Sequence, residues 1–138
     1  MKTRIIIIIC LFFTAHVSLA MESIGKLKNP DAVYITERCS ANALAISIMG
    51  GKANNKSVQD GFKKIYTFFA NTGIAIAMSN FPSLSERKIS EQRMLNILSL
   101  EEIITKDMDK FYLQNGSAIS GYIKEDMNIC QELYRKSK

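Results

Sequence analysis

Apolar residues recur at intervals of three and four along most of the chain beyond residue 30. In the first such run the recurring positions are Ala32, Ile35, Cys39, Ala43, Ile46 and Met49. This spacing is typical of one face of an α-helix. Asn29-Pro30-Asp31 precedes the run, which predicts a helix with Asn29 as its capping residue, Pro30 as its first helical residue and Asp31 as an acid in its first turn. Gly50-Gly51 predicts its end.

A second helix is predicted to begin at Ser57, which can cap it. Its apolar face carries Val58, Phe62, Ile65, Phe69, Thr72 and Ile76. Asn80-Phe81-Pro82 predicts its end, because the residue before a proline avoids helical backbone angles.

Two further helices follow. Ser83-Leu84-Ser85-Glu86 matches a capping box in front of a long third helix, whose apolar positions are Met94, Ile97, Leu98, Ile104, Met108 and Phe111. Asn115-Gly116-Ser117 indicates a turn. The last helix is outlined by Ile119, Ile123, Met127, Cys130 and Tyr134. No stretch alternates apolar and polar residues as a strand does, so the sequence predicts an all-α fold, a small antiparallel (up-down) four-helix bundle.

The first twenty residues have a different pattern. Lys2 and Arg4 precede an unbroken apolar run over 5–13, and Ser18-Leu19-Ala20 places small residues where a signal peptidase cuts. This is the pattern of a secretory signal peptide, and the apolar run is short for a membrane span. We therefore predict a signal peptide over 1–20, cleavage between Ala20 and Met21, and a helical domain over 21–138. Retention of residues 1–20 as an anchor is the alternative.

Cleavage changes which chemistry the chain can perform. The sequence has three cysteines, one histidine and a net charge of +5, and the signal segment contains Cys10 and His16. Two cysteines then remain in an oxidising compartment, which predicts a disulfide between Cys39 and Cys130. In an up-down bundle this disulfide would join the neighbouring first and last helices. Two buried free thiols are the alternative.

Two stretches, 39–51 and 65–86, are nearly free of charge. A helix that is apolar nearly all round is usually buried in a protein core, yet a bundle of four helices has no fully buried helix. Either the first two helices pack tightly on each other through small residues, or a partner or a second copy of the chain covers this surface. A second membrane span over 65–82 is disfavoured by its polar side chains.

Catalysis has little support in the sequence. Without a histidine the domain has no Ser-His-Asp, Cys-His or His-ligated metal site, so we predict no catalytic residue, no metal and no cofactor. The acidic pairs Glu101-Glu102 and Glu125-Asp126 are interpreted as solvated charges on helices. Lys63-Lys64 and the tail at 135–138 could touch an anionic membrane or polymer, but basic groups of this kind are usually just solvated. No basic run with interleaved aromatics indicates nucleic-acid binding.

These observations favour a secreted or periplasmic, non-catalytic binding or interaction module. Its partner would be another protein, a ligand or a second copy of the chain, bound through apolar helix surface. The alternatives are a membrane-associated component that retains residues 1–20, and a small hydrolase or lyase that uses carboxylates or lysine. Asn55 and Asn115 begin glycosylation sequons in predicted loops, which matter only in a eukaryotic secretory pathway.

Overall fold

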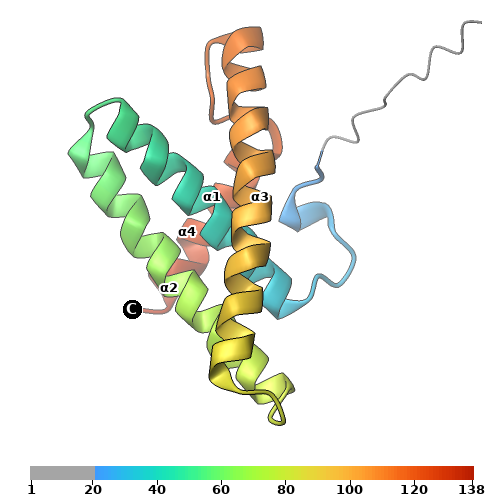
Figure 1. Cartoon of the computed structure of the whole chain (residues 1–138). Coiled ribbons are helices and arrows are strands. Elements are labelled where there is room, and N and C mark those ends of the chain that lie inside the picture. The colour runs from blue at the N-terminus through green and yellow to red at the C-terminus, as the bar shows by residue number, and fades with distance from the viewer. Residues whose placement is uncertain (1–20) are drawn as a thin grey trace, which may run out of the picture.

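The structure, a computed structural model, describes residues 21–138, and this part of the chain is helical with no strand (Figure 1). A short 3-10 helix, η1 (Ile24–Lys26), precedes α1 (Ala32–Lys52), α2 (Lys56–Asn80), α3 (Glu86–Asn115) and α4 (Gly121–Lys136). The predicted all-α class with four helices is thereby confirmed. The predicted signal peptide, including Ala20 of the cleavage junction, lies outside the described residues.

The predicted start of α1 is displaced by two residues. Asp31 is the capping residue, and its carboxylate accepts hydrogen bonds from the backbone N–H groups of Val33 and Tyr34 at 2.7 and 3.2 Å. Pro30 therefore lies before the cap rather than in the first turn. An aspartate oxygen satisfies amide groups that the first turn leaves without partners, which favours Asp31 over Asn29 as the cap.

Four other predicted helix ends also shift. The side chain of Asn55, not Ser57, caps α2 by accepting from the N–H of Val58. Ser85 caps α3, because a turn closed by Leu84 N–H and Phe81 C=O delays the helix beyond Ser83. Helix α1 continues through Gly50 and Gly51 to Lys52, where the α2 backbone comes so close that a Cβ at Gly50 would lie 2.9 Å from Gln59 N. Asn115, which was expected in a loop, is the last residue of α3, and Gly116 follows it with a φ of 75°.

Helix α1 is the central element of the fold. It contacts α2, α3 and α4, and α4 also packs on η1 and α2. Figure 1 shows α1 and α2 side by side in opposite directions, with the long α3 crossing in front of them. All residues over 36–43 are buried. The expectation that no helix is fully buried is therefore wrong for the middle of α1, because segments of the same chain surround it.

The charge-free part of α2 turns one face towards α1. Ile65, Phe69, Ala70, Gly73 and Ala77 are buried, while the intervening outer positions are exposed or half-buried. This confirms the interpretation that the first two helices pack tightly on each other. Within 21–138, no helix combines the length and apolar character needed to cross a membrane.

Helices α1 and α2 also lie close together at Gly73. A Cβ added there would lie 2.5 Å from Oγ1 of Thr36, whose hydroxyl is held in place by donation to Val33 C=O. Real Cβ atoms essentially never show so short a contact, so the small size of glycine sets the distance between these two helices at this point.

This close contact predicts opposite effects for two substitutions in one helix. Gly61 is exposed, and an added Cβ there meets nothing within 4 Å, so G61A should raise the free energy of unfolding by about 0.5–1 kcal/mol through helix propensity. G73A gains the same propensity but overpacks the core, which costs about 1–3 kcal/mol, so its net effect should be destabilising. Urea denaturation of both variants measures the difference, and equal stabilisation by both would contradict the packing.

Candidate functional site

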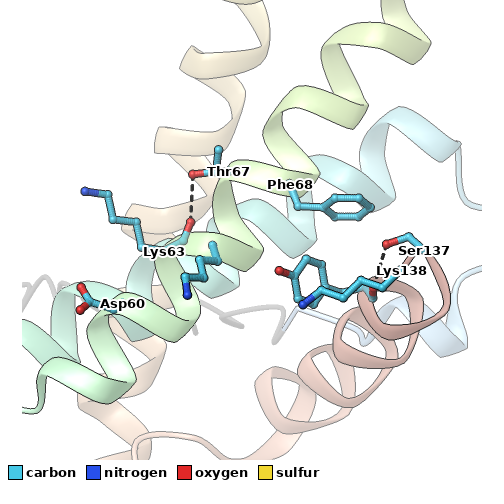
Figure 2. A pocket seen from close by; sticks show the side chains of 8 residues that line it. Asp60, Lys63, Thr67, Phe68, Ser137 and Lys138 are labelled. Atoms are coloured by element: carbon cyan, nitrogen blue, oxygen red, sulfur yellow. Dashed lines mark hydrogen bonds between the residues drawn. The ribbon is translucent and has the colours of Figure 1, made fainter.

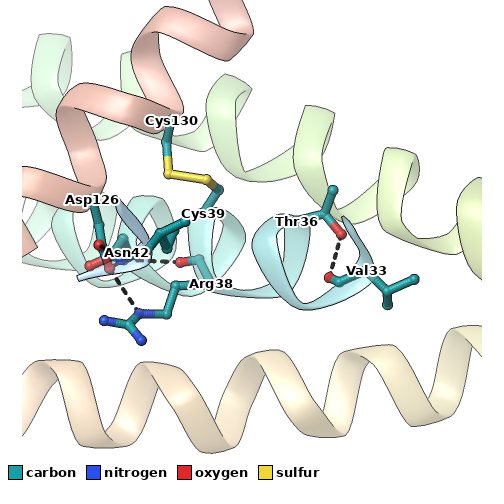
Figure 3. Close-up of a disulfide and its surroundings, with 8 residues drawn as sticks. Val33, Thr36, Arg38, Cys39, Asn42, Asp126 and Cys130 are labelled. Carbon is teal, nitrogen blue, oxygen red and sulfur yellow. Dashed lines mark hydrogen bonds and ion pairs between the residues drawn. A yellow bond between two sulfur atoms is a disulfide. The ribbon is translucent and has the colours of Figure 1, made fainter. Parts of the chain in front are cut away.

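A disulfide fixes α4 to the central helix. Cys39 of α1 and Cys130 of α4 are fully buried, with their Cα atoms 5.5 Å apart and their sulfur atoms at bonding distance (Figure 3). The cysteine pair predicted from the sequence is thus brought together by the first and last helices. Because Tyr134 follows Cys130 by about one helical turn, the disulfide also sets where the end of α4 lies.

A buried ion pair lies next to the disulfide. Nε of Arg38 is 2.8 Å from Oδ2 of Asp126, and the two side chains are 1% and 0% exposed. Asp126 also accepts from the backbone N–H of Ile24 at 2.6 Å and from the side-chain amide of Asn42 at 3.4 Å. The interpretation of Asp126 as a solvated charge is therefore wrong, because the buried face of α4 carries it into the core; its neighbour Glu125 is exposed, as expected.

The other N–H groups of Arg38 connect further segments of the chain to this ion pair. Its Nη1 donates to the hydroxyl of Tyr34 at 2.9 Å and its Nη2 to the backbone carbonyl of Glu22 at 2.5 Å. The guanidinium also lies over the ring of Tyr122, 5.0 Å from its centroid. Residues 22–24, α1 and α4 therefore meet at one charged pair. Sequence reasoning missed Arg38, although its place beside Cys39 was a usable signal.

Ionisation in this cluster is governed by burial. Burial raises the pKa of the Asp126 carboxyl above its ordinary value, against the opposing effects of Ile24 N–H, Arg38 and Asn42. Burial also raises the pKa of Tyr122, together with the hydrogen bond to the Asp107 carboxylate and its charge. Asp126 is enclosed and already hydrogen-bonded, so we interpret the cluster as structural support.

An open groove between α2 and the end of α4 is the candidate functional site (Figure 2). It has a volume of about 660 Å³. Helix α2 and the C-terminal end of the chain supply its lining, which consists of Asp60, Lys63, Lys64, Thr67, Phe68, Tyr134, Ser137 and Lys138. Lys63-Lys64 and the basic tail, which the sequence offered as separate weak signals, are thereby brought together, although Arg135 and Lys136 of the tail are not among the lining residues.

Two aromatic rings give the groove an apolar wall. The rings of Phe68 and Tyr134 meet edge to face with centroids 5.1 Å apart, and Phe68 meets Phe69 of the core in the same manner at 5.0 Å. Nζ of Lys138 lies over the Tyr134 ring, 4.6 Å from its centroid. Aromatic pairs of this geometry pack favourably, so the wall is continuous with the core of the protein.

The charged side chains of the groove are mostly ammonium groups, three lysines against one aspartate. The hydroxyl groups of Thr67 and Ser137 already donate to the backbone carbonyls of Lys63 and Tyr134, at 3.0 and 2.7 Å. Within 21–138, no carboxylate forms an ion pair with Lys63, Lys64 or Lys138, and all three lysines are exposed. In Figure 2, Asp60 lies at the end of the groove away from Phe68 and Lys138. These groups can attract an anion and pack against an apolar group.

Metal binding would need several ligands close together in the part of the chain that the structure describes. This part has no cluster of three or more histidine, cysteine or acidic residues that could hold a metal ion. Comparisons with protein-family models, with curated proteins and with solved structures found no match to this chain. A function for this chain is therefore inferred from the geometry of its own residues.

The predicted disulfide has a direct chemical and energetic test. Peptide mapping of the unreduced, denatured protein should recover the peptides of Cys39 and Cys130 linked to each other. Reduction should lower the free energy of unfolding by about 4–5 kcal/mol, because the bond closes a long loop, 91 residues in sequence separation, in the unfolded chain. Alkylation of both cysteines without prior reduction would contradict the disulfide.

Proposed function

We propose that this chain is an exported, non-catalytic binding module whose groove between α2 and α4 binds an anionic ligand with an apolar part. The observation that carries the proposal is the meeting of Lys63, Lys64 and Lys138 beside the Phe68–Tyr134 wall. Lys63, Lys64 and Phe68 belong to α2, whereas Tyr134 and Lys138 lie far along the chain, and the two groups of residues line one groove.

Charge and shape support an anionic ligand over a neutral one. The side chains that line the groove include three ammonium groups and one carboxylate, so their net charge is positive. Exposed charge pairs contribute about 0.2–1 kcal/mol each and are screened by salt. The aromatic wall adds apolar contact area, which explains why we expect the ligand to carry both an anionic group and an apolar part. Binding should accordingly weaken as the salt concentration rises.

The proposal also includes export of the chain and an up-down order of its four helices. The sequence pattern over 1–20 and the disulfide both suit a secreted or periplasmic protein. The opposite directions of α1 and α2, and the covalent link between the first and last helices, support the antiparallel up-down order (Figure 1).

Decyl phosphate below its micelle concentration is a suitable probe of the groove, because it joins an anionic group to an apolar chain. The variant K63Q/K64Q/K138Q should bind it about tenfold more weakly in calorimetric titration, since three exposed charge pairs are lost. The matched control K28Q/K110Q/K124Q removes the same charge at exposed positions outside the groove lining and should stay within twofold of the natural protein.

Two results would contradict this function. One is equal weakening by the groove and control variants, which would mean that net charge alone governs binding. The other is absence of binding to the natural protein at low salt. Inorganic phosphate should bind much more weakly than decyl phosphate, because it cannot use the aromatic wall.

Sequencing of the exported protein tests the localisation. The expected N-terminal residue is Met21, because a signal peptidase would cut after Ala20. A protein that is found in the membrane fraction and still begins with residues 1–20 would instead support the anchored alternative.

A further inference from the structure

A second cavity lies apart from the groove, between α1, α3 and the connection from α3 to α4. Its volume is about 240 Å³. The lining comprises Ala45, Ile48, Met49, Lys52, Thr105, Met108, Asp109, Tyr112 and Ala118, and it shares no residue with the groove between α2 and α4. The two sites can therefore be tested independently.

The walls of this cavity are predominantly apolar. Ala45 and Met108 are buried and Met49 is half-buried, whereas Ile48 and Tyr112 are 40% and 63% exposed. Methionine side chains are flexible and polarisable, and they adapt to ligands of different outline. A ligand in the cavity would cover apolar side chains that are now partly open to solvent.

The connection that carries Ala118 has a defined conformation. Gly116 and Gly121 both have positive φ, 75° and 53°, which favours glycine at these two positions. Between them, the Ser117 N–H donates to Oδ1 of Asn115 at 3.0 Å and the Ser117 hydroxyl donates to the Ile119 carbonyl at 3.3 Å. Ala118 is thus held in the cavity wall by local backbone geometry, and we conclude that the cavity is preformed.

Size and charge limit the ligand. A cavity of about 150 Å³ lined by apolar side chains holds benzene, so 240 Å³ accommodates a somewhat larger ring system. One cation, Lys52, and one anion, Asp109, belong to the lining, so it carries no net charge. We propose that this cavity binds a small, neutral, mainly apolar or aromatic molecule of about the size of indole.

Indole itself is a convenient probe, because the chain contains no tryptophan whose fluorescence would obscure it. Titration into the protein, expressed as the full chain and purified in oxidised form, should shift indole emission with a dissociation constant of about 0.1–1 mM. With ¹³C-methyl-labelled methionine, the signals of Met49 and Met108 should shift. Met78 of α2, which does not line the cavity, should not shift.

Filling the cavity tests the assignment. A118L and T105L place extra carbon atoms in the cavity from two different walls, and each should weaken indole binding at least tenfold. A75L adds the same side chain at an exposed position of α2 and should leave the affinity unchanged. Circular dichroism verifies that each variant is folded, and T105L keeps the test valid if A118L disturbs its loop.

Three outcomes would overturn the proposal. They are unchanged Met49 and Met108 signals up to the solubility limit of indole, a shift of Met78 equal to theirs, and undiminished binding by both filled variants. None of these outcomes bears on binding in the groove between α2 and α4, whose lysines are absent from this cavity.

Discussion

The ion pair between Arg38 and Asp126 joins three parts of the chain that are separate in sequence. A charge without a partner in a protein interior is strongly unfavourable, so the two side chains must be brought together for this core to form. Asp126 belongs to α4, Arg38 to α1, and the backbone of residues 22–24 forms one hydrogen bond with each of them. The fold around α1 therefore cannot form in full unless α4 and the residues before η1 pack at the same place.

The packing of α1, α4 and residues 22–24 around this ion pair, the central junction of the fold, also determines where the groove lies. Cys130 lies one helical turn beyond Asp126 and bonds to Cys39, the residue next to Arg38, so α4 is held to α1 at two adjacent points. Tyr134 comes one turn later and meets Phe68. Helix α2 is in turn set against α1 by the close contact of Gly73 with Thr36. The two walls of the groove are thus both positioned relative to the central helix, while its lysines remain in solvent.

Much of this architecture was accessible from sequence because periodic apolar positions report directly which helix faces are buried. The four helices and the Cys39–Cys130 pair follow from spacing and from the number of cysteines outside the predicted signal peptide. The helix caps were less accessible, since residues two positions apart, such as Asn29 and Asp31, or Asn55 and Ser57, have similar capping chemistry. Which of the two residues caps the helix depends on how the preceding loop enters that helix.

The ion pair and the groove were harder to predict for different reasons. Arg38 and Asp126 lie close in sequence to predicted core cysteines, but a charged side chain is ordinarily expected in solvent. Their burial depends on the ion pair between them, which forms only when α1 and α4 pack together. The groove depends on where α2 and α4 meet, because Lys64 and Lys138 are far apart along the chain. Local patterns contain no information about that meeting point, whereas the junction at α1 determines it.

The most direct test of the central junction is the free energy of unfolding of D126N, measured by urea denaturation with the disulfide intact. This variant keeps the shape of the side chain but leaves the Arg38 guanidinium buried without its anion. The expected loss is about 3–5 kcal/mol, with faster hydrogen exchange at Ile24 and along α4. E91Q, which breaks the exposed pair of Arg87 and Glu91, should change stability by no more than about 0.5 kcal/mol. A D126N protein as stable as E91Q, with unchanged exchange in α4, would contradict the account.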